Sequence, residues 1–285
     1  MPADLFILFG ALRDGELETY GERLAAPLRA QGLGVDFCSM GALESLPEGC
    51  AAIPLLAWNY HFDAPLWRER LAMLSRLPVK LPNSASLLAW NTDKIYLRDL
   101  AGRGAPIVPT LFRDRVTSRD TEAARASFGV DTIVVKPTIS AGSKETLKLG
   151  PNDLLIGAPK GAAMIQPFLP AIQQEGELSL IFVGGAFSHA LWKRAAAGDY
   201  RIQSLYGGTE HAVQPDPRDL ARAEAVMAML PFDQAPLYAR IDMVRGLDGE
   251  LALIEAELIE PYLYPLQDDR FGVRFAGAVL QRLGH

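Results

Sequence analysis

The sequence predicts a chain that begins as an α/β domain and continues as α+β, and three observations support this fold class. Strand-like apolar runs alternate with helical periodicity between residues 4 and 77, a pattern typical of a parallel sheet with crossover helices. From residue 131 onward, strand-like runs follow each other across short turns, which predicts antiparallel pairing. The chain has 285 residues and is 49% hydrophobic, which is enough for two or three domains with buried cores.

The N-terminal elements follow from the spacing of apolar residues. The first helix ends at Gly32, since glycine readily adopts the backbone conformation that ends a helix. Strands are expected at residues 4–9, 35–38 and 52–57, and helices at residues 18–31 and 64–77.

The middle of the chain begins with one long helix over residues 84–103, capped by Asn83 or Ser84 and ended near Gly102 or Gly104. A loop over residues 105–110 leads into a strand. Further strands are expected at residues 131–136 and 163–168, with a glycine- and serine-rich loop over residues 138–146 between them.

Two hairpins and two helices make up the C-terminal part. The first hairpin pairs residues 177–183 with 186–193 across Gly184-Gly185, and the second turns at residues 246–249. Helices are expected at residues 221–230 and 271–283.

The second hairpin carries three acidic residues in apolar strands. Pairing the strands around the turn places Asp242 opposite Leu253 and diagonal to Glu255. Because side chains alternate along a strand, Asp242, Glu255 and Glu257 project to one face and repel each other. A divalent cation would relieve this repulsion, and hard oxygen ligands suit Mg²⁺. The alternative is an exposed edge hairpin with solvated acids, which the apolar flanking residues disfavour.

A lysine at the end of a strand precedes the glycine- and serine-rich loop. Lys136 is followed by Pro-Thr-Ile-Ser-Ala-Gly-Ser-Lys-Glu145, and flexible loops of this kind fold over phosphates and donate backbone N–H groups. The segment lacks the glycine and lysine spacing of a Walker A motif, and a plain surface loop is an equally good interpretation. Lys94 on the preceding helix says little alone, because a lone helical lysine is usually solvated.

Other polar residues follow strand ends. The connector at residues 166–170 leaves backbone polar groups that a flat adenine could pair with, and Glu175 and Glu177 could accept hydrogen bonds from ribose hydroxyls. The cations Lys193, Arg194 and Arg201 flank a small-residue segment. Cations near three carboxylates suggest that an anion and a metal ion meet, as in phosphoryl transfer.

Composition and motifs argue against several classes of protein. A net charge of −6 and a pI near 5.3 disfavour a nucleic-acid binder and favour a cytoplasmic protein. Cys38 and Cys50 have no zinc or disulfide spacing, no apolar run has the length of a membrane helix, and the N-terminus does not resemble a signal peptide. The four histidines show no metal spacing, and neither a GxSxG elbow nor a GxGxxG turn after a strand is present.

The order of these features resembles the ATP-grasp superfamily, roughly over residues 83–265. Within it the chain is similar to glutathione-synthetase-like ligases, nearest to D-cycloserine-forming ligases and their bacterial relatives. The matching motifs are Trp58-Asn-Tyr-His61, Trp90-Asn-Thr-Asp-Lys94, Gly176-Glu-Leu-Ser179, Gly198-Asp-Tyr-Arg201, Gly207-Gly208 and Glu257-Leu-Ile-Glu-Pro261.

This resemblance implies a three-domain ATP-grasp fold with ATP held between the second and third domains. The implied domains are an N-terminal α/β domain over residues 1–83, a central lid domain over 84–162 and a C-terminal domain with the metal site over 163–285. Glutathione synthetases carry arginine at the position of Ser179 and asparagine at that of Glu257, which argues against glutathione as the product and leaves the substrate open.

The resemblance also assigns roles to residues. ATP phosphates would be held by Lys94 and Lys136, with a lid loop that contains Ser140, Gly142, Ser143 and Lys144. Adenine would lie against Gln166, Pro167, Phe168 and Leu169, and ribose against Glu177. Two Mg²⁺, or Mn²⁺ in their place, would bind Asp242, Glu255 and Glu257. Lys193 and Arg201 would be catalytic, facing the γ-phosphate and an acyl phosphate. Trp58, Asn59 and His61 would contact the substrate, although a structural role is as good an interpretation for His61.

The sequence therefore predicts an ATP-dependent carboxylate–amine ligase that acts on a small amino-acid-like substrate, with ligation within one molecule and a homodimer both left open. Nucleic acid and membranes are not expected partners. The alternatives are an ATP-grasp kinase, which would stop at phosphoryl transfer, and a nucleotide-binding module without turnover. A Rossmann-like methyltransferase is disfavoured, because Gly10 and Gly15 are too sparse to form its glycine loop.

Overall fold

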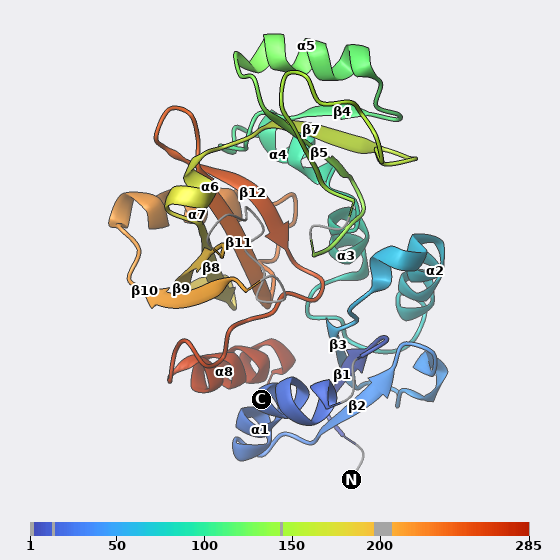
Figure 1. Cartoon of the computed structure of the whole chain (residues 1–285). Helices are drawn as coiled ribbons and strands as arrows, with labels where there is room; N and C mark the ends of the chain where they lie inside the picture. The colour runs from blue at the N-terminus through green and yellow to red at the C-terminus, as the bar shows by residue number, and fades with distance from the viewer. Residues whose placement is uncertain (1–2, 13–14, 143–144, 197–206, 285) are drawn as a thin grey trace.

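The computed structural model describes residues 3–12, 15–142, 145–196 and 207–284, and three sheets follow one another along the chain (Figure 1). The first is parallel, the second and third are antiparallel, and their strand orders are β2-β1-β3, β4-β7-β5-β6 and β10-β9-β8-β11-β12. The predicted change from α/β to α+β is therefore confirmed.

The N-terminal sheet is short and covered by helices. Its strands are β1 (Leu5–Phe9), β2 (Val35–Ser39) and β3 (Ala51–Leu56). A π-helical turn η1 (Leu17–Gly21) leads into α1 (Glu22–Ala30), and the short turns η2 (Leu43–Ser45) and η3 (Tyr60–Asp63) precede α2 (Ala64–Leu74). These elements confirm the strands and helices expected from the apolar spacing of residues 4–77.

The long helix expected over residues 84–103 is wrong, because the chain forms two helices. They are α3 (Ala85–Asn91) and α4 (Tyr96–Gly102). Ser84 caps α3 by accepting from the Leu87 backbone N–H at 3.2 Å. Asn83 instead holds two strand ends, because its side chain donates to the carbonyls of Tyr238 and Leu258 at 3.1 and 2.9 Å and accepts from Leu237 N–H at 2.7 Å.

The middle sheet contains β4 (Leu111–Arg113), β5 (Ile133–Pro137), β6 (Leu147–Leu149) and β7 (Ala163–Pro167). Helix α5 (Ser118–Phe128), absent from the sequence expectations, packs on this sheet and begins at a capping box between Thr117 and Asp120. Strand β7 pairs with β4 and β5, so it lies in the middle sheet and not with the third predicted domain. The domain boundaries themselves stay a prediction.

The third sheet contains β8 (Glu177–Val183), β9 (Ala186–Arg194), β10 (Thr209–Val213), β11 (Tyr238–Arg245) and β12 (Leu251–Glu257). The remaining helices are α6 (Ala171–Gln174), α7 (Pro217–Ala228) and α8 (Phe271–Leu283). Helix α7 begins four residues earlier than expected, because Asp216 caps it and Pro217 occupies its first position.

Both faces of the third sheet carry buried apolar side chains. Leu178, Leu180 and Phe182 of β8 pack in the cluster that includes α2, α3 and α4, whereas Ile181 and Val183 pack in the cluster that includes α1 and α8. Helix α8 thus lies beside α1, although the two helices stand at opposite ends of the sequence (Figure 1). Within the described residues, none of the helices combines the length and the apolar character needed to cross a membrane.

Candidate active site

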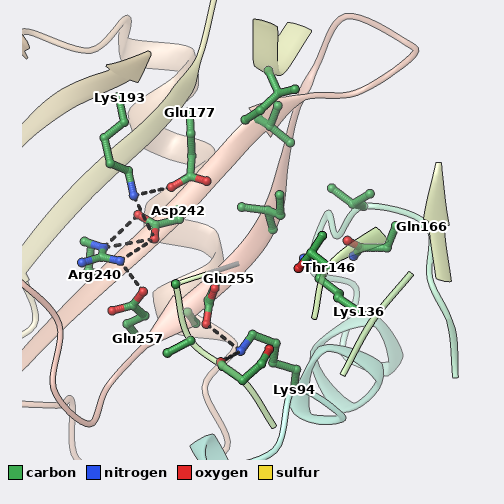
Figure 2. Close-up of a pocket in the computed structure, with 18 of the residues that line it drawn as sticks. Lys94, Lys136, Thr146, Gln166, Glu177, Lys193, Arg240, Asp242, Glu255 and Glu257 are labelled. Atoms are coloured by element: carbon green, nitrogen blue, oxygen red, sulfur yellow. Dashed lines mark hydrogen bonds and ion pairs between the residues drawn. The ribbon is translucent and has the colours of Figure 1, made fainter. Parts of the chain in front are cut away.

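A cavity of about 640 Å³ opens between the middle and third sheets. Residues of β5 and β7 line one wall and residues of β8, β11 and β12 line the other, as Figure 2 shows for Lys136 and Gln166 facing Asp242 and Glu257. Most of the residues predicted from sequence line this cavity: Lys94, Lys136, Ser140, Gly142, Gln166, Pro167, Phe168, Leu169, Glu177, Lys193, Asp242, Glu255 and Glu257.

The acidic hairpin has a different register from the one predicted. Asp242 lies opposite Glu255, not opposite Leu253, and Arg240 lies opposite Glu257. The two-residue difference has two sources. Arg245 pairs with Leu251, so the turn is one residue longer than predicted, and a β-bulge adds the second shift, because Met243 pairs with Leu253 and Ile254 is an extra residue on β12. The bulge places the carboxylates of the two strands directly across from each other on the face that lines the cavity.

Arg240 is the residue that holds these carboxylates together. Its Nε lies 3.0 Å from both Asp242 oxygens, and its other nitrogens bind Glu257 and, at 3.2 Å, the carbonyl of Tyr262. Ser179 on β8 donates a further hydrogen bond to Asp242. Burial alone would raise the pKa of Asp242, but Arg240 and Lys193 hold it at about 2.

Lys193 approaches the same carboxylate from β9. Its ammonium binds Glu177 on β8 and lies 3.4 Å from Asp242 (Figure 2). Burial would lower the pKa of Lys193, but Asp242 and Glu177 outweigh this effect and raise it, so the side chain is charged. Glu177 therefore faces the charged end of the cavity, whereas the resemblance assigns it to ribose.

Lys94 lies in the break between α3 and α4 and not on a helix face. Its backbone N–H donates to the Thr138 carbonyl at 2.8 Å, and its ammonium lies 3.0 Å from Glu255 and 2.5 Å from the Ser140 carbonyl. The break allows one buried lysine to connect the glycine-containing loop with the acidic hairpin.

Lys136 lies at the end of β5 and points into the same cavity from the middle sheet (Figure 2). Among the residues that the structure describes, no carboxylate lies within ion-pair distance of its ammonium. Burial lowers the pKa of Lys136 to about 8, with a further contribution from Lys94, while Glu255 raises it. A bound anion would stabilise the charged form. The predicted residues Ser143, Lys144 and Arg201 lie outside the described residues.

The other end of the cavity is apolar. Val108, Val134, Ile172, Val244 and Ile254 line it together with the connector at residues 166–169. Two backbone groups of the connector are already bonded, since Phe168 N–H donates to the Thr132 carbonyl and the Leu169 carbonyl accepts from Ile172 N–H. These two groups are therefore not free for adenine, and the assignment of adenine to the connector stays a prediction.

The predicted substrate residues Trp58, Asn59 and His61 do not line the cavity, but Tyr60 does. Trp58 stacks on Tyr20 and donates from its indole N–H to the Glu260 carbonyl at 3.2 Å. Asn59 has a positive φ of 70° and donates to the Ala11 carbonyl at 2.8 Å. These contacts give Trp58 and Asn59 structural positions around the cavity wall.

Several cavity residues were missed from sequence. Arg240 received no role, although its position two residues before Asp242 puts it on the same face of the strand. Tyr60, Tyr262, Tyr264 and Glu260 also line the cavity. The tyrosines gave no signal, since isolated aromatic residues in loops are as common in structural roles.

The hairpin carboxylates have the donor chemistry of a Mg²⁺ site, since all are hard oxygen ligands that reach one cavity. Among the described residues, however, no group of three or more acidic, histidine or cysteine side chains is arranged as a metal site. Arg240 and Lys94 neutralise the carboxylates, so the expected repulsion does not by itself require a metal ion. The metal-ligand assignment stays a prediction.

Comparisons with known proteins agree with this geometry. No family model matches the chain. The cycloserine biosynthesis protein DcsG of Streptomyces lavendulae is 32% identical over 234 residues, covering 75% of this chain and 76% of that protein. A glutathione synthetase of Prochlorococcus marinus (strain MIT 9313) is 28% identical over 179 residues, covering 60% of this chain and 55% of that protein.

Solved structures show the same likeness. The crystal structure of the D-cycloserine synthetase DcsG matches with a TM-score of 0.85 and 25% identity, covering 98% of this chain and 99% of that chain. The ATP-grasp ligase PsnB, complexed with a precursor peptide and AMPPNP, matches with a TM-score of 0.69 and 14% identity over 99% of both chains, which shows the fold alone. Sequence and fold thus point to the same group of proteins.

Proposed function

Because the chain belongs to the ATP-grasp ligases, the family of DcsG and the glutathione synthetases, we propose that it activates the carboxylate of a small amino-acid-like substrate as an acyl phosphate and joins it to an amine. Ligases of this family form C–N bonds and use ATP with divalent metal ions. The products would be an amide, ADP and phosphate. The likeness to a cycloserine synthetase favours an amine within the same molecule.

The observation that carries this proposal is the placement of cations on both walls of one cavity. Lys94 and Lys136 extend from the middle part of the chain, and Lys193 and Arg240 extend from the third sheet (Figure 2). Phosphoryl transfer places negative charge on oxygens on every side of the moving phosphorus, so a catalyst benefits from positive charges fixed before the reaction.

The adenine and the phosphates of ATP would lie at opposite ends of the cavity. The apolar slot beside residues 166–169 suits adenine, and Lys94 and Lys136 would hold the phosphates through charge-assisted hydrogen bonds. Asp242, Glu255 and Glu257 would hold two Mg²⁺, or Mn²⁺ in their place. A bound metal ion would supply further neutralisation of the phosphate oxygens.

Residues of the third sheet would contact the phosphoryl group as it passes to the substrate carboxylate. A substrate carboxylate oxygen attacks the γ-phosphorus and ADP leaves, while Lys193 and Arg240 stabilise the charge on the transferred group. The amine nitrogen then attacks the acyl carbon, phosphate departs, and the proton lost from nitrogen passes to the phosphate or to water. Residues of both walls exclude water from this exchange, which protects the acyl phosphate from hydrolysis.

A substrate screen tests the proposal. The protein is incubated with ATP, Mg²⁺ and pools of amino acids, ureido acids and dipeptides, and ADP release is measured. Hydroxylamine in parallel samples traps an acyl phosphate as a hydroxamate. ADP release together with a hydroxamate supports a ligase, whereas a stable phosphoester would identify a kinase. Asp242→Asn should abolish turnover. Asp219→Asn is the matched control, because Asp219 is also buried and paired with an arginine but lies outside the cavity.

A further inference from the structure

Glu260 differs in its partners from four other acidic residues of the cavity. Each of Glu177, Asp242, Glu255 and Glu257 has a lysine or arginine within 4 Å. Among the described residues, no cationic side chain lies within that distance of the Glu260 carboxylate. A half-buried carboxylate without a cation is unfavourable, because burial removes water without supplying a counter-charge.

The segment that carries Glu260 is held rigidly. The Glu260 carbonyl accepts from Trp58, the Pro261 carbonyl accepts from the Tyr20 hydroxyl at 3.3 Å, and the Leu263 N–H donates to the same hydroxyl at 2.9 Å. Tyr262 stacks on Tyr20 with ring centroids 4.3 Å apart. The carboxylate is therefore presented to the cavity from a fixed backbone, as a binding residue requires.

The surroundings favour an organic cation over a metal ion. Mg²⁺ needs several oxygen ligands, but the carbonyls of residues 260–262 already accept hydrogen bonds within the protein. Tyr60 lines the cavity with Glu260 and is close enough to feel its charge, and aromatic faces attract ammonium groups. Burial, together with Glu257 and Glu255, raises the pKa of Glu260 well above its usual value, so a bound cation would restore its charge.

Glu210 provides a useful contrast. It also lines the cavity, on β10, but the neighbouring charges that act on it are those of Lys193 and Arg240. A positive ligand would be repelled there. Glu260 instead lies in the field of carboxylates, so it is the acidic residue best placed to receive a cation.

We propose that Glu260, with Tyr60, binds the ammonium group of the substrate, so that the substrate is a free amino acid. The proposal rests on the ligase function above and narrows its substrate class. Arg240 donates to the Tyr262 carbonyl, so the cation assigned to the transferred phosphoryl group and the acid assigned to the ammonium are fixed to one short segment. The substrate ammonium and the phosphoryl group that its carboxylate receives would then be held by neighbouring residues.

Matched pairs of acids test this assignment. D- and L-alanine are compared with propionate, and D- and L-serine with 3-hydroxypropionate, using hydroxylamine as acceptor and measuring hydroxamate and ADP. The wild type should prefer the amino acid of a pair. Glu260→Gln should raise KM for that amino acid about tenfold or more, because a charged hydrogen bond is lost, while the KM for ATP stays unchanged. Glu260→Asp should retain the preference, and Glu210→Gln should leave the ratio within each pair unchanged.

Binding measured without turnover separates the two proposals. Calorimetry of the same acids with AMPPNP and Mg²⁺ should show amino-acid binding that Glu260→Gln weakens. Such binding without any hydroxamate would overturn the ligase function but keep the ammonium site. Hydroxamate formed equally well from both members of each pair would overturn the ammonium site and keep the ligase. If the main change in Glu260→Gln is a higher Mg²⁺ or Mn²⁺ requirement, Glu260 is a metal ligand and not an ammonium site. Absence of both binding and turnover with all pairs would overturn both proposals.

Discussion

Replacing Arg240 by methionine should destabilise the protein strongly unless Mg²⁺ is supplied. The substitution keeps most of the apolar stem but removes the guanidinium that contacts both Asp242 oxygens and Glu257. Two carboxylates on neighbouring strands then face each other, and Lys193, which also binds Glu177, is the one cation left near Asp242 among the described residues. Their repulsion and their lost hydrogen bonds both act against the folded state.

The size of the effect follows from burial. The Asp242 side chain is 3% exposed and that of Arg240 is 9% exposed, whereas Glu257 is 26% exposed and can gain water. Most of the penalty therefore falls on Asp242. Breaking one buried pair of this kind costs about 3–5 kcal/mol. At about 2–4 °C per kcal/mol for proteins near this size, Tm should fall by about 6–20 °C.

Thermal and urea unfolding without nucleotide measure this loss, with and without Mg²⁺. The double variant Arg240→Met/Asp242→Asn should recover part of the stability, since it removes the unpaired charge. Arg245→Met is a matched control on the same strand, and it should cost less because the Arg245 side chain is 28% exposed and lies outside the cavity. If Asp242, Glu255 and Glu257 form the metal site, Mg²⁺ should raise the Tm of Arg240→Met more than that of the wild type. A Tm of Arg240→Met within about 2 °C of the wild-type Tm corresponds to a stability loss of less than about 1 kcal/mol. That result would refute the role of Arg240 as the buried partner of Asp242.

Three further predictions concern other parts of the cavity and its support. Lys136 should take up a proton when ATP binds near and above pH 8, since its pKa of about 8 rises beside phosphate, and ATP affinity should therefore fall as pH increases through about 8. Calorimetry in buffers of different ionisation enthalpy measures this proton uptake, which should be absent in Lys136→Met. Glu255→Gln should raise the Mg²⁺ concentration needed for half-maximal turnover at least tenfold and should also lower Tm, because the Lys94 side chain, 7% exposed, loses its ion-pair partner; an unchanged Mg²⁺ dependence would remove Glu255 from the metal site. Asn83→Ala should lower the free energy of unfolding by about 2–4 kcal/mol, because three buried backbone groups lose their partner, and urea denaturation that shows less than about 1 kcal/mol would contradict that role.

Elements with strong local signals were predictable from sequence. Helix α8 begins and ends where its apolar spacing predicts, at Phe271 and Leu283, and the turn at residues 246–249 joins the two strands expected. The N-terminal strands and the change to antiparallel pairing also follow from local patterns. These features depend on periodicity and on glycine turns, both of which are readable within a short window.

Features that depend on distant contacts were not predictable. The helix expected over residues 84–103 breaks because Asn91 bonds to Ala256 and Leu258 of the last hairpin, which no local pattern reveals. The bulge at Ile254 changes the register of the acidic hairpin for a similar reason, since Leu253 also bonds to the segment at residues 106–108. Helix α5 is a different case, because its capping box and its final Gly129 were visible in the sequence and were overlooked.

The candidate site was predictable in its residue types more than in its arrangement. The resemblance brought together most of the lysines and acids that the structure places around one cavity. It did not indicate that Arg240 would lie between Asp242 and Glu257. It also did not indicate that Trp58 would donate a hydrogen bond to the backbone of Glu260. The position of Trp58 depends on a contact between residues 202 apart in the sequence, and the position of Arg240 depends on the hairpin register that the bulge changes. Residue type alone determines neither.

The packing of α1 against α8 has a consequence for synthesis on the ribosome. The cluster that buries Leu24 and Leu28 also contains Phe271 and Phe275, and the Tyr20 hydroxyl bonds to Pro261 and Leu263. The core around α1 is therefore completed only after α8 has been synthesised. Nascent chains would expose apolar surface on α1 until α8 emerges, and the tyrosine-lined wall of the cavity would form in the same late step.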